Sequence, residues 1–152
     1  AEQTDYDAPP AARYSYETWV VSAHRTPDLT YAYAETAAER GLDVVIAGAG
    51  GKSADLPNVT ASVAYPLPTV GVPVHERSVD SVIGMPTGAP LVAVDAGKSY
   101  NAAMAAVQIL ATDDPDLRAR LTDLREERRA EVARVSRALH DEGVDGFRGD
   151  DG

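Results

Sequence analysis

Short apolar runs alternate with helix-like segments along most of the chain. Four runs have the composition of β-strands, and they cover residues 18–21, 43–47, 69–72 and 91–94. The second and fourth are almost wholly apolar, which is typical of parallel strands buried on both faces. This order of segments predicts an α/β fold with a three-layer, flavodoxin-like parallel sheet.

Helical spacing and helix-end signals fill the intervals between the predicted strands. A first helix begins at Pro27 and ends before Gly41, because proline suits the first turn and glycine the residue after the last turn. The other expected helical segments are a short helix or turn within residues 52–63, a short helix over 78–83 and a helix over 100–111.

A much longer amphipathic pattern occupies the C-terminal part of the chain. It begins at Pro115 after two acidic residues and ends at Gly143. Apolar residues recur at helical spacing, at Leu117, Leu121, Leu124, Val132, Val135 and Leu139. We expect an oligomer-forming arm; alternatively, this helix is solvated and folds back on its own domain. The pattern predicts an α/β domain over residues 1–112, a C-terminal helix over 113–142 and a disordered tail over 143–152.

Composition narrows the partners and surroundings of the protein. The 152 residues carry a formal net charge of −10, which argues against nucleic acid because nucleic acids bind basic faces. No apolar run is long enough for a membrane span, and without cysteine there are no disulfides and no thiolate chemistry. We expect a cytoplasmic protein. Only Lys52 and Lys98 are lysines among 14 basic residues, which favours adaptation to concentrated salt over a merely acidic protein.

A polar turn follows the first predicted strand. It holds a hydroxyl, an imidazole and a guanidinium, on Ser22, His24 and Arg25, and Thr26 suits the N-cap of the next helix. Ligands of open α/β sheets bind at the carboxyl ends of strands. These groups are therefore expected to bind an anion or a hydroxyl-rich sugar and to move a proton near neutral pH.

A glycine-rich segment follows the second predicted strand. Gly48, Gly50 and Gly51 surround Ala49, and glycines let backbone N–H groups approach a ligand closely. The same strand-end rule places this segment in one crevice with the turn at residues 22–25. Alternatively, the segment is only a tight turn.

Five short blocks between Thr18 and Ala111 carry a family resemblance. They are residues 20–27, residues 47–51 followed by Leu56-Pro57, residues 68–74, Asp80-Ser81 with residues 85–90, and residues 101–103. In this order they resemble the class I phosphoribosylaminoimidazole carboxylase family. Its members are N5-carboxyaminoimidazole ribonucleotide mutases of purine biosynthesis, and they are usually homo-octamers.

The resemblance implies an isomerisation that needs no cofactor and no metal. A carboxylate would move from the exocyclic nitrogen, N5, to ring carbon C4 of an aminoimidazole ribonucleotide, with His24 as the catalytic proton shuttle. Ser22 and Arg25 would hold the ribose-phosphate, and the glycine-rich backbone would line the carboxylate and imidazole end. The substrate-binding residues implied are Ser22, Ala23, Arg25, Gly48, Ala49, Gly50, Gly51 and Leu56.

Two features depart from the family pattern. The family begins with a strand and a Gly-Ser-x-Ser-Asp loop that are not found here, so we expect an N-terminally incomplete domain. Residues 52–55 (Lys-Ser-Ala-Asp) stand where two small residues and a histidine are common. His75, in a loop, and His140, near a helix C-terminus, are expected to be bystanders.

Two other functions remain open from the sequence. One is direct carboxylation of aminoimidazole ribonucleotide by CO₂, which belongs to the same family. The other is a non-catalytic nucleotide-binding module, because the first phosphate-binding loop is not found. The coding sequence upstream of Ala1 would separate an enzyme from such a module.

Overall fold

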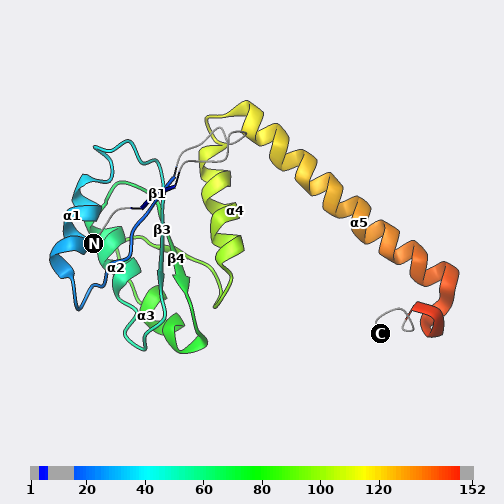
Figure 1. Cartoon of the computed structure of the whole chain (residues 1–152), viewed down its shortest axis with the longest axis horizontal. Coiled ribbons are helices and arrows are strands. Elements are labelled where there is room, and N and C mark those ends of the chain that lie inside the picture. The colour runs from blue at the N-terminus through cyan, green and yellow to red at the C-terminus, as the bar shows by residue number, and fades with distance from the viewer. Residues whose placement is uncertain (1–3, 7–15, 148–152) are drawn as a thin grey trace. The chain divides into compact units, whose positions relative to one another are not determined.

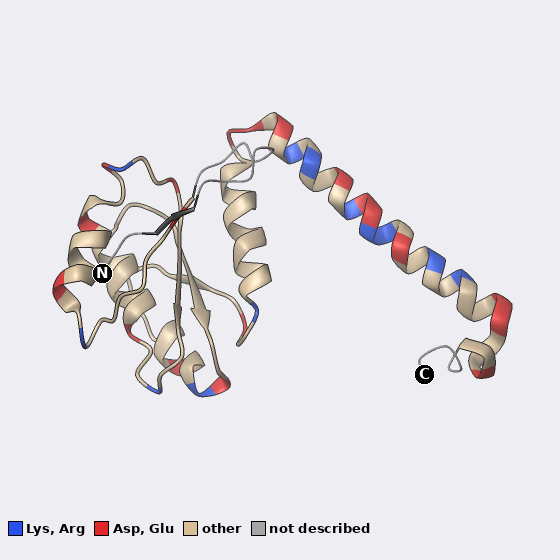
Figure 2. Cartoon of the chain, in the orientation of Figure 1, with Lys and Arg blue, Asp and Glu red and all other residues tan. Residues whose placement is uncertain are grey.

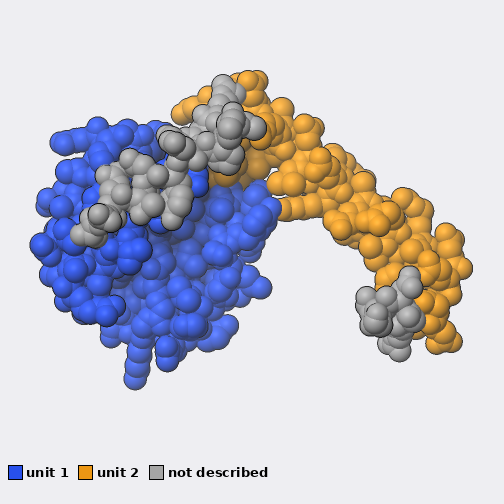
Figure 3. All heavy atoms as spheres, in the orientation of Figure 1, with its two compact units in different colours: residues 1–106 blue, residues 107–152 orange. Residues whose placement is uncertain are grey.

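The computed structural model describes residues 4–6 and 16–147 (Figure 1). The chain forms two compact units, residues 1–106 and residues 107–152 (Figure 3). The described strands are β1 Thr4–Tyr6, β2 Tyr16–Thr18, β3 Val45–Ala49, β4 Thr69–Pro73 and β5 Val92–Ala93. The described helices are α1 Pro27–Thr36, α2 Leu56–Val63, α3 Val79–Ile83, α4 Ser99–Leu110 and α5 Pro115–Phe147, with a 3₁₀ turn, η1, at Glu76–Ser78.

A three-stranded parallel sheet in the order β3-β4-β5 lies at the centre of the first unit. All five residues of the middle strand, β4, are buried. The expectation that the second and fourth strands are buried on both faces is wrong, because Ile46 in β3 is 47% exposed and Val92 in β5 is 64% exposed. The register aligns Val45 with Thr69 and Val70 with Val92. The predicted α/β fold with a flavodoxin-like parallel sheet is confirmed.

Helices cover both faces of this sheet. α2 packs against β3 and β4, α3 packs against β4 and β5, and α1 packs against α2. The first turns of α4 lie on the opposite side of the sheet from α2 (Figure 1). Ala102 and Ala106 are buried in α4, whereas Ala103 is exposed.

The first predicted strand is wrong in place and in pairing. The strand forms at Tyr16–Thr18 instead of residues 18–21, and it pairs antiparallel with β1, outside the parallel sheet. Val20 is 86% exposed. The apolar run favours an extended chain, but a strand also needs a hydrogen-bonding neighbour, and among the described residues only Thr18 of this segment has one, whereas residues 19–21 do not pair with another strand. Within the described residues, β3 pairs only with β4.

Other element boundaries differ from the prediction by a few residues. α1 ends at Thr36, and the chain reaches Gly41, at φ +83°, through turns instead of continuing as helix. The predicted strand over residues 43–47 begins two residues later, and the segment from Lys52 becomes helical only at Leu56. The start of α2 coincides with Pro57 in its first turn, a position that suits proline because an amide there has no partner within the helix.

The C-terminal helix is the main element of the second unit. Leu117 is its one buried residue among those described, and both signs of charge follow one another along its length (Figure 2). Gly143 breaks the helical backbone at φ 72°, as predicted, but a further helical turn continues to Phe147. The rest of the expected tail, residues 148–152, lies outside the described residues. No described helix is both long and apolar enough to cross a membrane.

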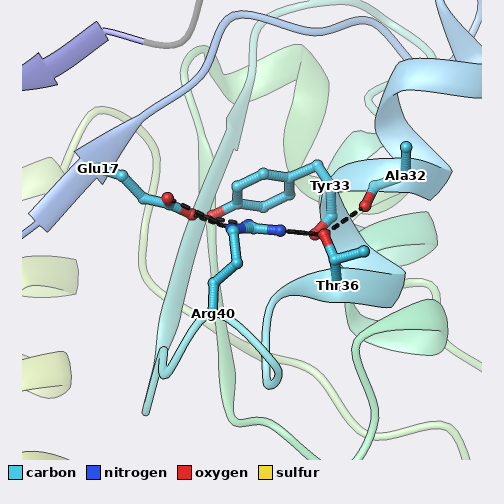
Figure 4. Close-up of polar contacts among 5 residues, drawn as sticks. All are labelled: Glu17, Ala32, Tyr33, Thr36 and Arg40. Carbon is cyan, nitrogen blue, oxygen red and sulfur yellow. Dashed lines mark hydrogen bonds and ion pairs between the residues drawn. The ribbon is translucent and has the colours of Figure 1, made fainter.

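A cluster of aromatic and charged side chains ties β2 to the end of α1 (Figure 4). Arg40 Nη2 lies 2.7 Å from Glu17 Oε1, and its guanidinium lies 5.7 Å from the Trp19 ring and 4.9 Å from the Tyr33 ring. Arg40 also donates hydrogen bonds to the Tyr33 carbonyl and the Thr36 hydroxyl. Burial raises the pKa of the Tyr33 phenol, and the Glu17 charge adds to this while the Arg40 charge opposes it. The cluster holds the two ends of the segment that contains His24.

Candidate functional site

Residues 22–26 close into a tight turn just before α1. The Thr26 amide donates to the Ser22 carbonyl at 2.9 Å, and the Ser22 amide donates to Thr26 Oγ1 at 2.8 Å. The Arg25 amide donates to Ser22 Oγ at 3.2 Å. Thr26 occupies the predicted N-cap position of α1, yet its side chain makes no capping bond because its oxygen accepts from the Ser22 amide inside the turn. His24 and Arg25 are therefore left exposed at the tip, with Ala23 beside them.

The His24 imidazole faces the start of α2. Its Nε2 lies 3.0 Å from Asp55 Oδ2, and the two side chains are 61% and 42% exposed. Asp55 is the N-cap residue of α2, directly before Leu56. The ring is thus accessible, and it is directed toward the helix that follows the glycine-rich segment.

The glycine-rich segment spans the end of β3 and the loop after it. None of Gly48, Gly50 and Gly51 has a positive φ, so their use here is the absence of a side chain and not an unusual backbone. A Cβ on Gly50 would lie 3.5 Å from the Cδ2 of His75. Ser78 Oγ donates to the Gly51 carbonyl at 2.8 Å, which ties the loop to η1.

His75 is a site candidate in the structure, although its place in a loop predicts a bystander. It lies against Gly50 just after the carboxyl end of β4, and with Glu76 and Arg77 it lines an open hollow of about 410 Å³. The signal that could have identified it is the strand-end rule, which applies to β4 as it does to β3. His140, the other expected bystander, lies on α5 in the second unit.

The candidate residues thus form two neighbouring groups. One joins the turn at residues 22–26 to the start of α2 through His24 and Asp55. The other joins the glycine-rich segment to His75 and η1. In the part of the chain that the structure describes, no hydrogen bond or ion pair links the Arg25 guanidinium to either group. No cluster of three or more His, Asp and Glu side chains with metal-binding geometry occurs in residues 16–147.

Comparisons with known proteins bear on this arrangement. Residues 10–131 match the family described as AIR carboxylase. The "N5-carboxyaminoimidazole ribonucleotide mutase" of Bacillus subtilis is 45% identical over 132 residues, which cover 82% of this chain and 80% of that protein. The protein of the same name from Mycobacterium tuberculosis is 45% identical over 127 residues, 80% of this chain and 68% of that protein. The "Phosphoribosylaminoimidazole carboxylase" of Schizosaccharomyces pombe is 49% identical over 108 residues, 67% of this chain and 19% of that protein.

Proposed function

Because the chain belongs to the AIR carboxylase family, we propose that it is an isomerase of de novo purine biosynthesis. Its reaction converts N5-carboxyaminoimidazole ribonucleotide into 4-carboxyaminoimidazole ribonucleotide. One observation carries the proposal: 45% identity over about four-fifths of both this chain and the Bacillus subtilis mutase. The substrate is a small ribonucleotide, in agreement with the net charge of −10, since binding to nucleic acid requires a basic surface.

His24 is the proposed proton shuttle. Its imidazolium donates a proton to the exocyclic nitrogen while the bond from that nitrogen to the carboxylate breaks and CO₂ forms. Carbon C4 then donates an electron pair to CO₂, and the now neutral imidazole removes the C4 proton, which restores the aromatic ring. The proton returns to His24, so the reaction balances without another acid or base. The exposure of the ring supports this role, because a buried imidazole could not reach a substrate.

The remaining candidates are proposed to hold the substrate. Arg25 is exposed at the tip of the turn, where its guanidinium can bind a phosphate with two parallel hydrogen bonds. Ser22 contributes less freely, since its oxygen already accepts from the Arg25 amide. The backbone at Gly48–Ala49–Gly50–Gly51, together with Ala23 and Leu56, is expected to line the imidazole and carboxylate end and to retain CO₂.

An assay with two substrates tests this function. The full-length protein, in concentrated salt, is given either the N5-carboxylated ribonucleotide or aminoimidazole ribonucleotide with CO₂. We expect conversion of the first, and a His24→Asn variant should lose about 100-fold or more in kcat, because general acid–base catalysis contributes about 10²–10⁴-fold. His140→Asn, at an exposed position on α5, is the matched control and should leave the rate unchanged.

Each other result has a definite meaning. Turnover of the second substrate alone would assign the chain to direct carboxylation. Binding of the nucleotide without turnover of either substrate would favour the non-catalytic module. A His24→Asn variant with full activity would refute the proton shuttle while leaving the reaction in place.

The assembly is proposed to be a homo-octamer in the cytoplasm of a cell with concentrated salt. The support for an oligomer is α5, which exposes Val132, Val135 and Leu139 at 69%, 44% and 38%. A helix with an apolar stripe and little buried surface of its own is stabilised when a partner covers that stripe. The few lysines and the net charge of −10 support the salt adaptation.

A further inference from the structure

The carboxylate of Asp55 is used in an unusual way. Asp55 occupies the N-cap position of α2, where an aspartate ordinarily accepts a hydrogen bond from an amide in the first turn. No such capping bond forms. Each carboxylate oxygen instead contacts a residue outside α2, so a role other than capping is required to explain them.

The two oxygens of Asp55 bridge two other elements. Oδ2 lies 3.0 Å from His24 Nε2, and Oδ1 accepts a hydrogen bond from Ser81 Oγ on α3 at 3.1 Å. The Ser81 carbonyl in turn accepts a hydrogen bond from Asn58 Nδ2 on α2 at 2.7 Å. Ser81 and Asn58 are both partly buried, so these residues of the folded domain hold the carboxylate in place. The exposed imidazole of His24 lies at the end of this chain of contacts.

We propose that Asp55, held by Ser81, is a positioning residue that orients His24 and selects the nitrogen through which it reacts. An ionised carboxylate only accepts hydrogen bonds, so the neutral imidazole must carry its hydrogen on Nε2 to bind it. The lone pair then lies on Nδ1, which makes no hydrogen bond or ion pair within the described residues. Nδ1 is therefore the nitrogen that gives and retakes the substrate proton. This inference rests on the proposed function of His24.

A purely structural role explains these contacts less well. His24 and Asp55 are both substantially exposed, and exposed ion pairs contribute little to stability. An aspartate that served the stability of α2 would bind its first-turn amides. The two roles predict different outcomes, because a structural role affects unfolding whereas a positioning role affects turnover through His24 alone.

Kinetics of matched variants separate the two roles. Asp55→Asn keeps the shape but removes the charge, and it should lower kcat about tenfold or more while KM changes less than about twofold. Asp43→Asn, the same change at an exposed position before β3, is the control and should have no effect. Ser81→Ala should lower kcat by a smaller factor, whereas Ser62→Ala, exposed on α2, should not. In a His24→Asn background, Asp55→Asn should cause no further loss, because its effect acts through the imidazole.

A second measurement does not depend on activity. The nitrogen chemical shifts of His24, read by NMR at alkaline pH where the ring is neutral, should show one tautomer with hydrogen on Nε2. In Asp55→Leu the shifts should move toward an average of both tautomers. Unchanged shifts, or an additive loss in the double variant, would overturn the inference. A wild-type protein without mutase activity but with the single tautomer would refute the proposed function and leave the contact of Asp55 with His24 standing.

Discussion

Gly71 is the position where the packing of the sheet is least tolerant of added atoms. It lies in the buried middle strand, opposite Ala47 in β3 and Ala93 in β5. A Cβ added there would lie 2.8 Å from Val82 Cγ1 and 3.2 Å from Leu91 Cδ2. Ordinary contact begins at 3.4 Å, so the Val82 methyl would have to retreat by about 0.6 Å. Val82 is 0% exposed, which leaves it no open space to enter.

Gly71→Ala should therefore destabilise the fold by about 1–3 kcal/mol, the usual cost of overpacking a well-filled core. This is a large part of the ~5–15 kcal/mol that stabilises a typical domain. Urea denaturation followed by circular dichroism should show a lower midpoint with an unchanged slope. Val82→Ala in the same chain should recover part of the loss, because it removes the methyl that clashes.

The neighbouring strand supplies the matched control. A Cβ on Gly48 would lie 3.7 Å from its nearest neighbours, which is ordinary contact, so Gly48→Ala should leave the midpoint within experimental error. Equal midpoints for Gly71→Ala and the wild type would show that Val82 and Leu91 move freely, and the reasoning from close packing would be refuted.

Two further predictions concern the Tyr33 phenol and the apolar stripe of α5. The pKa of Tyr33 is raised in the folded state, so near and above about pH 10 the unfolded chain loses this proton first and the free energy of unfolding should fall as pH rises. In urea titrations at several pH values, Tyr33→Phe should make this fall less steep. An equally steep fall in the variant would contradict the assignment to Tyr33. Val135→Glu on the apolar stripe of α5 should reduce the oligomer size in sedimentation velocity, whereas Ala130→Glu on the opposite face should not; equal sizes would exclude the stripe as an interface.

Local patterns were sufficient for the elements whose signals lie within a few residues. β4, α4 and α5 were all expected close to their observed bounds, since apolar runs, helical spacing and acidic first turns are properties of neighbouring residues. The expected strand at residues 18–21 failed for the opposite reason. Its composition is suitable, but pairing depends on which backbone lies beside it, and no local pattern reports that.

The candidate site shows the same division. The polar turn with His24 and the glycine-rich segment were both identified from residue type and position after a strand. The contact of His24 with Asp55 could not be identified in this way, because the two residues are distant in sequence and come together only when α1 packs against α2. Thr26 occupies the predicted N-cap position of α1, but its hydroxyl bonds to the backbone of Ser22 inside the turn and makes no capping bond to the helix.

The unpaired edge of β3, within the described residues, has a consequence for handling this protein. Within the described residues that strand has one neighbour, it carries no charged or proline residue, and Ile46 on it is 47% exposed. The unpaired amides and carbonyls along such an edge can form hydrogen bonds with a strand of another molecule. The net charge of −10 keeps copies apart in dilute buffer, but about 1 M salt shortens electrostatic repulsion to roughly 3 Å. In molar salt, therefore, separate molecules stay apart at β3 only if another segment or subunit covers this edge of the sheet.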